Sequence, residues 1–411
     1  MGQLPVIIII IAVFVFDLVV SLVNYRQRTK PIPEVVRGVY DQQTYDKWLS
    51  YSMESLRFSL LVKTFNTILL LVLLLTGSFG WLERLTNGWF SHPILRSLAF
   101  LAVIGLGSML ANLPFDHYAT FVIEEKYGFN KSTRRTFFLD LLKNLLLGGI
   151  LGGLLVAGMQ ALFLLFSGRI WQFGLLAWAS IALVMTLLFT LNRLFVKLFN
   201  KLTPLPEGSL RSRIEALATS VGFKISSISV MDASRRSTKL NAFFSGLGRT
   251  REVVLYDTLV EKMSEDEIVA VLAHELGHAV HKDVPRMLLQ QVVLMGVYIL
   301  LFAFVAQDVG LAQAFGLSDA HFAFSLLLFA VLISPIDLLL DIPLNYLSRK
   351  VEYAADEFSA EHADARSIQG ALVRLAQENL ANLNPHPLYV WLHYNHPALA
   401  DRLSAIGQKR G

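Results

Sequence analysis

The stretch SEDEIVAVLAHELGHAVHKD, residues 264–283, determines how the rest of the chain is interpreted. Ser264 followed by Glu267 is a capping-box pattern, which predicts that a helix begins here. The apolar residues that follow have the spacing of a helix with one buried face. Gly277 leaves out a side chain on this helix, so another backbone can pack closely against it. The stretch is therefore predicted to be a capped helix packed inside a folded domain.

The same helix carries the pattern H-E-x-x-H. His274 and His278 are one turn apart and project from the same face, where two imidazoles can hold one Zn²⁺ ion. Glu275 is placed to act as a general base on a water molecule between them. The alternative is an ordinary amphipathic helix with two histidines and a glutamate. A chance match would seldom fall within a capped helix with an apolar face, so the pattern favours a zinc hydrolase.

A mononuclear catalytic zinc site usually has a third protein ligand. The best candidates lie in SRKVEYAADEFSA, residues 348–360, directly after the last apolar segment. Glu352 and Asp356 are one turn apart on a probable helix, so one can bind the metal while the other braces a histidine ligand. Spacing alone leaves these two residues as close competitors.

Composition places the chain in a membrane. Of its 411 residues, 54% are hydrophobic and only 17% are charged, which is far from the composition of a soluble domain. The net charge of +4 could suggest a nucleic-acid partner, but the basic residues cluster beside apolar segments, where they set membrane orientation instead. There is no cysteine, so disulfides and thiolate metal ligands are excluded.

Seven apolar segments are long enough to cross a bilayer as helices. The first lacks the basic start and the cleavage site of a signal peptide, so we expect it to be retained. The seven segments lie at about 4–23, 64–81, 97–113, 142–166, 170–196, 288–307 and 322–346.

These segments divide the chain into four parts. They are a membrane domain with five transmembrane helices (1–203), a protease segment with the metal helix (204–287), the last two transmembrane helices (288–347) and a C-terminal segment that completes the metal site (348–411).

Loop charges predict the orientation in the membrane. The first, third and fifth loops are rich in lysine and arginine, whereas the second and fourth contribute Arg84 and Arg169 and the sixth has neither residue type. Because basic loops remain in the cytoplasm, the N-terminus is predicted outside, and the metal helix and the C-terminus in the cytoplasm.

The fifth loop is predicted to be a small α+β domain. Residues 203–206, TPLP, break the preceding span, and residues 210–223 have helical periodicity. Three strand-like runs follow at 224–232, 241–248 and 251–260. An edge strand beside the metal helix could bind an extended peptide. The sheet could equally well only support the helix.

Several motifs together resemble one known family. They are HELGH at 274–278, NAFFSGLGRTREVVLYDTLV at 241–260, LNYLSRKVEYAADEFS at 344–359, HPALADRL at 396–403 and LPFDHYATFVIEEKYGFNKST at 113–133. Their sequences and order are similar to those of the integral-membrane zinc proteases of the type I CAAX prenyl protease family, which includes the a-factor-converting enzyme. The resemblance extends over nearly the whole chain.

The resemblance implies roles that spacing alone did not assign. It selects Glu352 as the third zinc ligand and Asp356 as the residue that supports the ligands. It places Asn241 on the strand that aligns the substrate. His396 would stabilise the oxyanion of the reaction, and Arg402 would line the active site.

The resemblance also implies a fold and a reaction. The fold is mainly α and polytopic, with seven transmembrane helices that enclose a chamber and a cytoplasmic, gluzincin-like α+β zinc metalloprotease domain. One Zn²⁺ ion per chain and a Glu general base would hydrolyse peptide bonds near the C-terminus of prenylated CAAX substrates, in a bacterial inner membrane or an endoplasmic reticulum membrane. The expected partners are a peptide or protein substrate and membrane lipid, with no nucleic acid.

Two alternatives to this function remain open. One is a quality-control peptidase that cleaves unprenylated membrane proteins. The other is a transporter or channel with a structural metal site, which is disfavoured because no internal repeat is visible and because a pore has no need of Glu275 beside His274.

Overall fold

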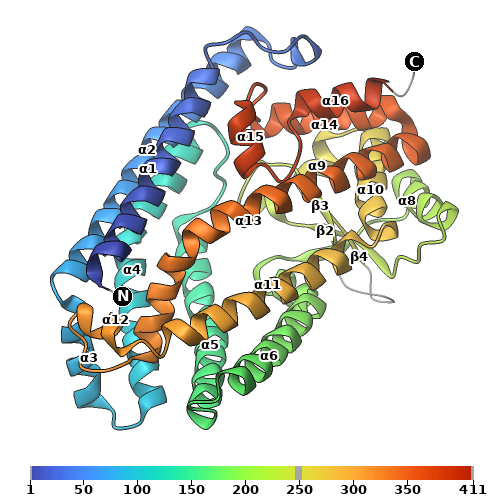
Figure 1. The fold of residues 1–411 in the computed structure, drawn as a ribbon. Coiled ribbons are helices and arrows are strands. Elements are labelled where there is room, and N and C mark those ends of the chain that lie inside the picture. The colour runs from blue at the N-terminus through green and yellow to red at the C-terminus, as the bar shows by residue number, and fades with distance from the viewer. Residues whose placement is uncertain (1, 246–251, 409–411) are drawn as a thin grey trace.

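The computed structural model describes residues 2–245 and 252–408, and it is mainly helical (Figure 1). Seven of its helices are long and apolar enough to cross a membrane, in agreement with the seven predicted segments. They are α1 (Gln3–Gln27), α2 (Gln42–Leu75), α4 (Pro93–Tyr118, extended by a π turn over Ala119–Glu124), α5 (Arg134–Leu165), α6 (Ile170–Thr190), α11 (Asp283–Val305) and α13 (Phe322–Ser359).

Two of the predicted segments end earlier than expected. The second was predicted to reach residue 81, but α2 ends at Leu75 and a separate helix, α3 (Ser78–Trp89), follows. Gly77 lies between them with a φ of 69°, a left-handed conformation that stops a helix and that glycine adopts without strain. The fifth segment was predicted to reach residue 196, but α6 ends at Thr190 and α7 (Asn192–Phe199) is separate.

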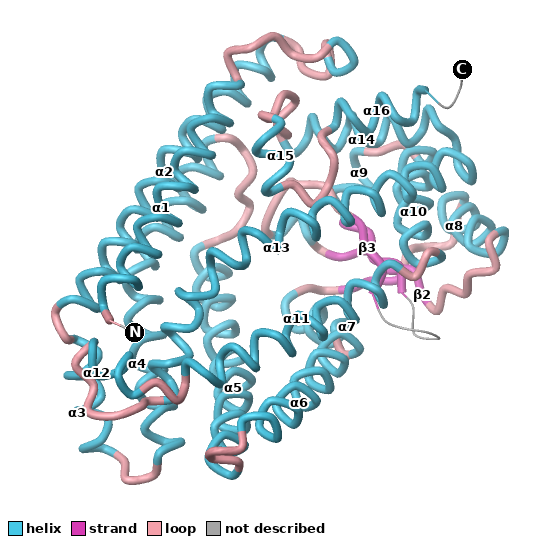
Figure 2. Tube along the Cα trace, viewed as in Figure 1, coloured by secondary structure: helices cyan, strands magenta, loops and turns pink. Residues whose placement is uncertain are grey.

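The protease part contains a small four-stranded sheet, which Figure 2 shows surrounded by helices. Three strands match the predicted runs, although residues 246–248 and 251 of those runs lie outside the described residues. The fourth strand was missed because TPLP was interpreted only as a chain break. The described strands are β1 (Leu202–Pro204), β2 (Ser227–Met231), β3 (Ala242–Ser245) and β4 (Glu252–Tyr256). Their order in the sheet is β1-β2-β4-β3. Strands β2 and β4 are parallel, and the other two pairs are antiparallel.

Helices α8 (Ser209–Ser220), α9 (Asp257–Lys262) and α10 (Glu265–Val280) complete the centre of the protease part. The predicted capping box begins α10, since the Ser264 side chain accepts from the Glu267 N–H while the Glu267 carboxylate accepts from the Ser264 N–H. One face of α10 is buried in a core shared with α8 and the sheet.

Helix α13 continues without a break from the membrane into the protease part. Its 38 residues make it about 57 Å long, so it exceeds the roughly 30 Å of a bilayer core. It packs directly against α10 at Gly277, where an added Cβ would lie 3.2 Å from the Cα of Ala355. A buried hydrogen bond of 2.7 Å from Ser359 Oγ to Ala270 O fixes the same contact. Membrane and protease parts therefore share one rigid helix.

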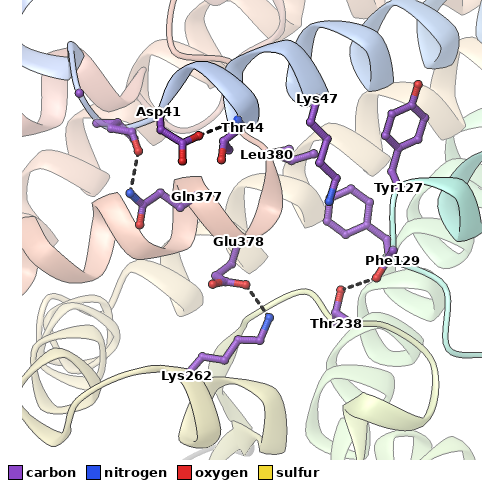
Figure 3. A pocket seen from close by; sticks show the side chains of 13 residues that line it. Asp41, Thr44, Lys47, Tyr127, Phe129, Thr238, Lys262, Gln377, Glu378 and Leu380 are labelled. Atoms are coloured by element: carbon purple, nitrogen blue, oxygen red, sulfur yellow. Dashed lines mark hydrogen bonds and ion pairs between the residues drawn. The ribbon is translucent and has the colours of Figure 1, made fainter.

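The C-terminal helices connect the protease part to the first loop. They are α14 (Ala365–Asn379), α15 (Pro387–His393) and α16 (Leu399–Gln408). The short helix α12 (Val309–Ala314), the 3₁₀ turns Glu34–Val36 and Ala233–Arg235 and the π turn Ala360–Asp364 complete the described elements. Figure 3 shows a cavity of about 560 Å³ where the first loop, residues 127–129 and the end of α14 meet. Gln377 donates to Val39 O at 2.6 Å there, so α14 holds the first loop in place.

Candidate active site

Two helices bring His274, His278 and Glu352 together. The histidines come from α10 and the glutamate from α13, and one ligating atom from each lies within 4.8 Å of the others. The two Nε2 atoms are 3.2 Å apart. Glu352 Oε2 is 3.5 Å from His274 Nε2, and Glu352 Oε1 is 3.4 Å from His278 Nε2. The three residues thus converge on one point, as residues that share one ion do.

The chemistry of this group fits a divalent cation. Among the described residues, Glu352 Oε2 has no hydrogen-bond partner although it is buried, and such an oxygen is costly unless a cation satisfies it. It lies 2.7 Å from His396 Nδ1, and that imidazole carries a positive charge only when it is protonated. Burial opposes a charge on His274, yet contacts with Asp356 and Glu352 outweigh burial and raise the pKa of His274 to about 9. The site therefore favours a positive charge.

Each histidine is held from behind by a buried carboxylate. Asp356 Oδ1 lies 2.9 Å from His274 Nδ1, and Asp283 Oδ2 lies 3.2 Å from His278 Nδ1. A carboxylate that accepts the Nδ1 proton leaves the Nε2 lone pair free to bind a metal. Asp356 was among the sequence candidates, but Asp283 was missed. Its only sequence signal is an acidic residue five positions after His278 in the quoted stretch.

Arg402 anchors Asp356 in turn. Its Nε and Nη2 atoms donate to the two oxygens of Asp356 at 2.7 and 2.6 Å, a bidentate pair. The same Nη2 lies 3.9 Å from Glu352 Oε2. Two of the guanidinium nitrogens of Arg402 are thus bonded to Asp356 inside the site. A direct contact between Arg402 and substrate stays a prediction.

Glu275 lies next to the three converging residues and is not tied to them. No hydrogen bond or ion pair joins its carboxylate to the other described residues, and its side chain is half-buried. Burial raises the pKa of Glu275, which makes it a better proton acceptor than an exposed carboxylate. This environment is what a general base needs.

His396 lies at the open side of the site. Its side chain is 58% exposed, in contrast to Glu352 beside it. Helix α15, which precedes the loop that carries His396, is held by α13: Asn345 Nδ2 donates to Leu392 O at 2.7 Å, and Arg349 Nη1 donates to Val390 O at 3.1 Å. Asn345, Arg349 and Glu352 lie along one face of that helix, so a single element positions both the third candidate ligand and His396.

Asn241 directly precedes β3, one of the two edge strands of the described sheet. Its carbonyl accepts from Tyr256 N at 3.1 Å, and its side chain accepts from the N–H of Ala242 at 2.9 Å. Because β3 pairs with β4 on one side only, its other edge can accept a further strand. Helix α10 packs against β3, so this edge lies close to the helix that carries His274.

Comparison with known proteins supports one family. A family model described as the CAAX prenyl protease N-terminal region with five membrane helices matches residues 21–201, and the model of peptidase family M48 matches residues 204–410. The probable CAAX prenyl protease 1 of Schizosaccharomyces pombe is 37% identical over 402 residues, which cover 93% of this chain and 83% of the relative. A CAAX prenyl protease 1 homolog of Arabidopsis thaliana is 34% identical over 407 residues, which cover 96% of this chain and 95% of the relative.

A solved structure extends the similarity to three dimensions. The crystal structure of S. mikatae Ste24p matches with a TM-score of 0.93 at 30% sequence identity, and the match covers 98% of each chain. The two family models together span nearly all of the sequence. The chain therefore belongs to the CAAX prenyl protease family of M48 peptidases, and it is a multi-pass membrane metalloprotease.

Proposed function

We propose that this protein is a zinc endopeptidase whose metal is held by His274, His278 and Glu352. The observation that carries the proposal is the convergence of these three side chains from α10 and α13, with ligating atoms within 4.8 Å of one another. Zinc in such a site polarises the scissile carbonyl and lowers the pKa of a water molecule. The transporter alternative is set aside because the chain belongs to a peptidase family.

The other residues of the site have distinct roles in this proposal. Glu275 accepts the proton of the attacking water and returns it to the leaving amine, as the raised pKa of its half-buried carboxylate favours. His396 donates to the developing oxyanion, a contact that is strongest in the transition state. Asp356 and Asp283 keep the two histidines in the tautomer and orientation that ligation requires.

The substrate is bound as an added strand. We infer that an extended peptide pairs with the open edge of β3 beside Asn241, which leaves the scissile bond over α10. Similar proteins from fungi and plants are called CAAX prenyl protease 1 or its homolog. We propose that this chain likewise cleaves a prenylated CAAX protein carboxyl-terminal to the prenylated cysteine and removes the last three residues.

We further propose that the site faces the cytoplasm and opens to a chamber between the seven helices. The basic first, third and fifth loops support this orientation. Sparse burial within the membrane supports the chamber. Only Trp48 and Leu74 are buried in the 34 residues of α2, and only Thr136 and Gln160 in the 32 residues of α5. Helices that packed tightly around a common core would bury a continuous stripe instead.

A matched pair of peptides tests the substrate assignment. The purified chain is incubated with one CAAX peptide in farnesylated and unmodified forms, and cleavage is followed by mass spectrometry. We expect cleavage of the farnesylated form at a much higher kcat/KM, and no cleavage of either form by Glu275→Gln. Equal kcat/KM for both forms would favour the quality-control alternative. Unchanged cleavage by Glu275→Gln would overturn the proposed mechanism itself.

A further inference from the structure

A cavity of about 460 Å³ lies at the end of α1, outside the active site. It is an open cavity lined by the loop between α1 and α2, by the first turn of α2 and by Leu383 from the segment between α14 and α15. In Figure 1 this loop is the blue segment at the top, at the same end of the molecule as α15 and α16. The lining residues that matter here are Arg28, Lys30, Arg37, Asp41, Tyr45 and Leu383.

Arg28 is a cation with no carboxylate partner among the described residues. Its guanidinium lies over the rings of Tyr25 and Trp48, at 5.2 and 5.7 Å from their centres. Its Nε and Nη1 atoms are buried without a hydrogen-bond partner. Burial lowers the pKa of Arg28, while only tyrosine side chains act in the opposite direction. A buried charge of this kind is costly unless an anion approaches it.

The remaining charges of the cavity have a positive balance. Lys30 is exposed and forms no ion pair among the described residues, whereas Arg37 is paired with Glu34 at 2.6 Å on the surface. The one lining carboxylate, Asp41, is occupied as the N-cap of α2, where it accepts from Thr44 N at 2.7 Å. Among the described residues, Arg28 and Lys30 thus line the cavity without a carboxylate partner.

The place of the cavity indicates the kind of anion. Helix α1 is one of the candidate membrane spans and ends at Gln27, so Arg28 directly follows a helix whose predicted span ends at about residue 23. Lipid headgroups lie at this depth, and basic pockets at the ends of transmembrane helices suit their phosphates. We propose that this cavity binds the phosphate group of an anionic membrane lipid, with Arg28 and Lys30 as its ligands.

Such a lipid would stabilise the contact between the first loop and the C-terminal segment. Asn384 Nδ2 lies 3.4 Å from Lys30 O and 3.1 Å from Pro31 O, so the loop that would bind the phosphate is bonded to that segment. Tyr45 donates to Arg28 O at 3.2 Å and fixes the base of the cavity. The C-terminal segment continues into the loop that carries His396. Lipid binding is therefore expected to raise the thermal stability of the protein.

The test measures lipid binding to the purified full chain in detergent. A soluble short-chain phosphatidylglycerol is titrated against the wild type, Arg28→Gln, Lys30→Gln and Arg26→Gln. Arg26 is the matched control, because it is an exposed cation two residues from Arg28 that does not line the cavity. Inorganic phosphate is titrated separately, and phosphatidylcholine of the same chain length is the uncharged-headgroup control.

We expect the wild type to bind one phosphatidylglycerol per chain. Lys30→Gln should lower the affinity for this lipid roughly fivefold, and Arg28→Gln should lower it by at least the same factor. Arg26→Gln should bind the lipid with wild-type affinity. If Arg28→Gln fails to fold, the comparison of Lys30→Gln with Arg26→Gln decides the same question. The proposal would be overturned if Arg26→Gln lost as much affinity for phosphatidylglycerol as Lys30→Gln, or if the wild type bound phosphatidylcholine as tightly as phosphatidylglycerol. Inorganic phosphate that binds as tightly as the lipid would assign the cavity to a free anion and would also overturn it.

Discussion

At the scale of single residues, the proposed metal site consists of three candidate ligands and the carboxylates that lie behind the two histidines. Asp356 contacts Nδ1 of His274, and Asp283 contacts Nδ1 of His278. Asp356 also accepts hydrogen bonds from Arg402. The motif H-E-x-x-H could be recognised in the sequence, whereas spacing left Glu352 and Asp356 as alternatives and only the family resemblance selected Glu352. Asp283 could not be assigned, because an acidic residue after a helix has many ordinary explanations. Only its 3.2 Å contact with His278 Nδ1 reveals its role.

The two aspartates give a prediction at this scale. Asp356→Asn and Asp283→Asn should each weaken zinc affinity or activity by roughly 10- to 100-fold without emptying the site, because the ligand remains but its orientation is lost. Zinc titration with a chelator and peptide cleavage measure both effects. The control is Glu361→Gln, which removes an exposed carboxylate from the turn after α13. An Asp356→Asn protein with wild-type affinity and activity would remove Asp356 from the site.

At the scale of elements, α13 joins the membrane part to the protease part. The sequence predicted a span at 322–346 and placed Glu352 on a helix just after it, and the structure shows one continuous helix over both. The two were separated because the apolar pattern that marks a span ends where the polar residues begin, although no residue there stops a helix. Strand β1 was missed for a related reason: TPLP has the residues of a chain break, and only pairing with β2 makes it a strand. Tertiary contacts of this kind are not visible in local sequence.

Arg349 provides the prediction for this scale. It donates to the carbonyl groups of Val390 and Tyr394 and so positions the loop that carries His396. We expect Arg349→Met to lower kcat roughly 10- to 100-fold with little change in KM or in bound zinc, because a small displacement of His396 weakens only the transition state. Steady-state kinetics and metal analysis measure these quantities.

Two comparisons separate this role from a general loss of structure. Lys350→Met removes the next cation along α13, an exposed residue, and should keep wild-type kinetics. In a His396→Ala background, Arg349→Met should cause little additional loss, since the group that it positions is already absent. Fully additive losses in the double variant would contradict the assignment.

At the scale of the whole molecule, sequence and structure agree on seven helices that are long and apolar enough to cross a membrane. Composition and apolar length are enough to predict the spans, because the bilayer allows few alternatives. The association of α10 with α13 could be predicted only through the family resemblance. Some 74 residues separate Glu352 from His278, and no periodicity links them.

The predicted orientation can be tested because the chain has no cysteine. Ser91→Cys lies in the second loop and Glu361→Cys beside the protease part, and both positions are exposed. A membrane-impermeant maleimide applied to intact cells should label Ser91→Cys, and it should label Glu361→Cys only after permeabilisation. Labelling of Glu361→Cys in intact cells would place the active site outside.

The most direct test of the proposed mechanism is the zinc content of two purified variants, measured by mass spectrometry alongside peptide cleavage. Glu275→Gln should retain about one zinc ion per chain and lose cleavage, because Glu275 moves a proton and does not hold the metal. Glu352→Ala should lose both the bound zinc and peptide cleavage, because one of the three proposed ligands is removed. A fully zinc-loaded and active Glu352→Ala protein, or a zinc-free Glu275→Gln protein, would contradict the assignment of His274, His278 and Glu352 as the metal site.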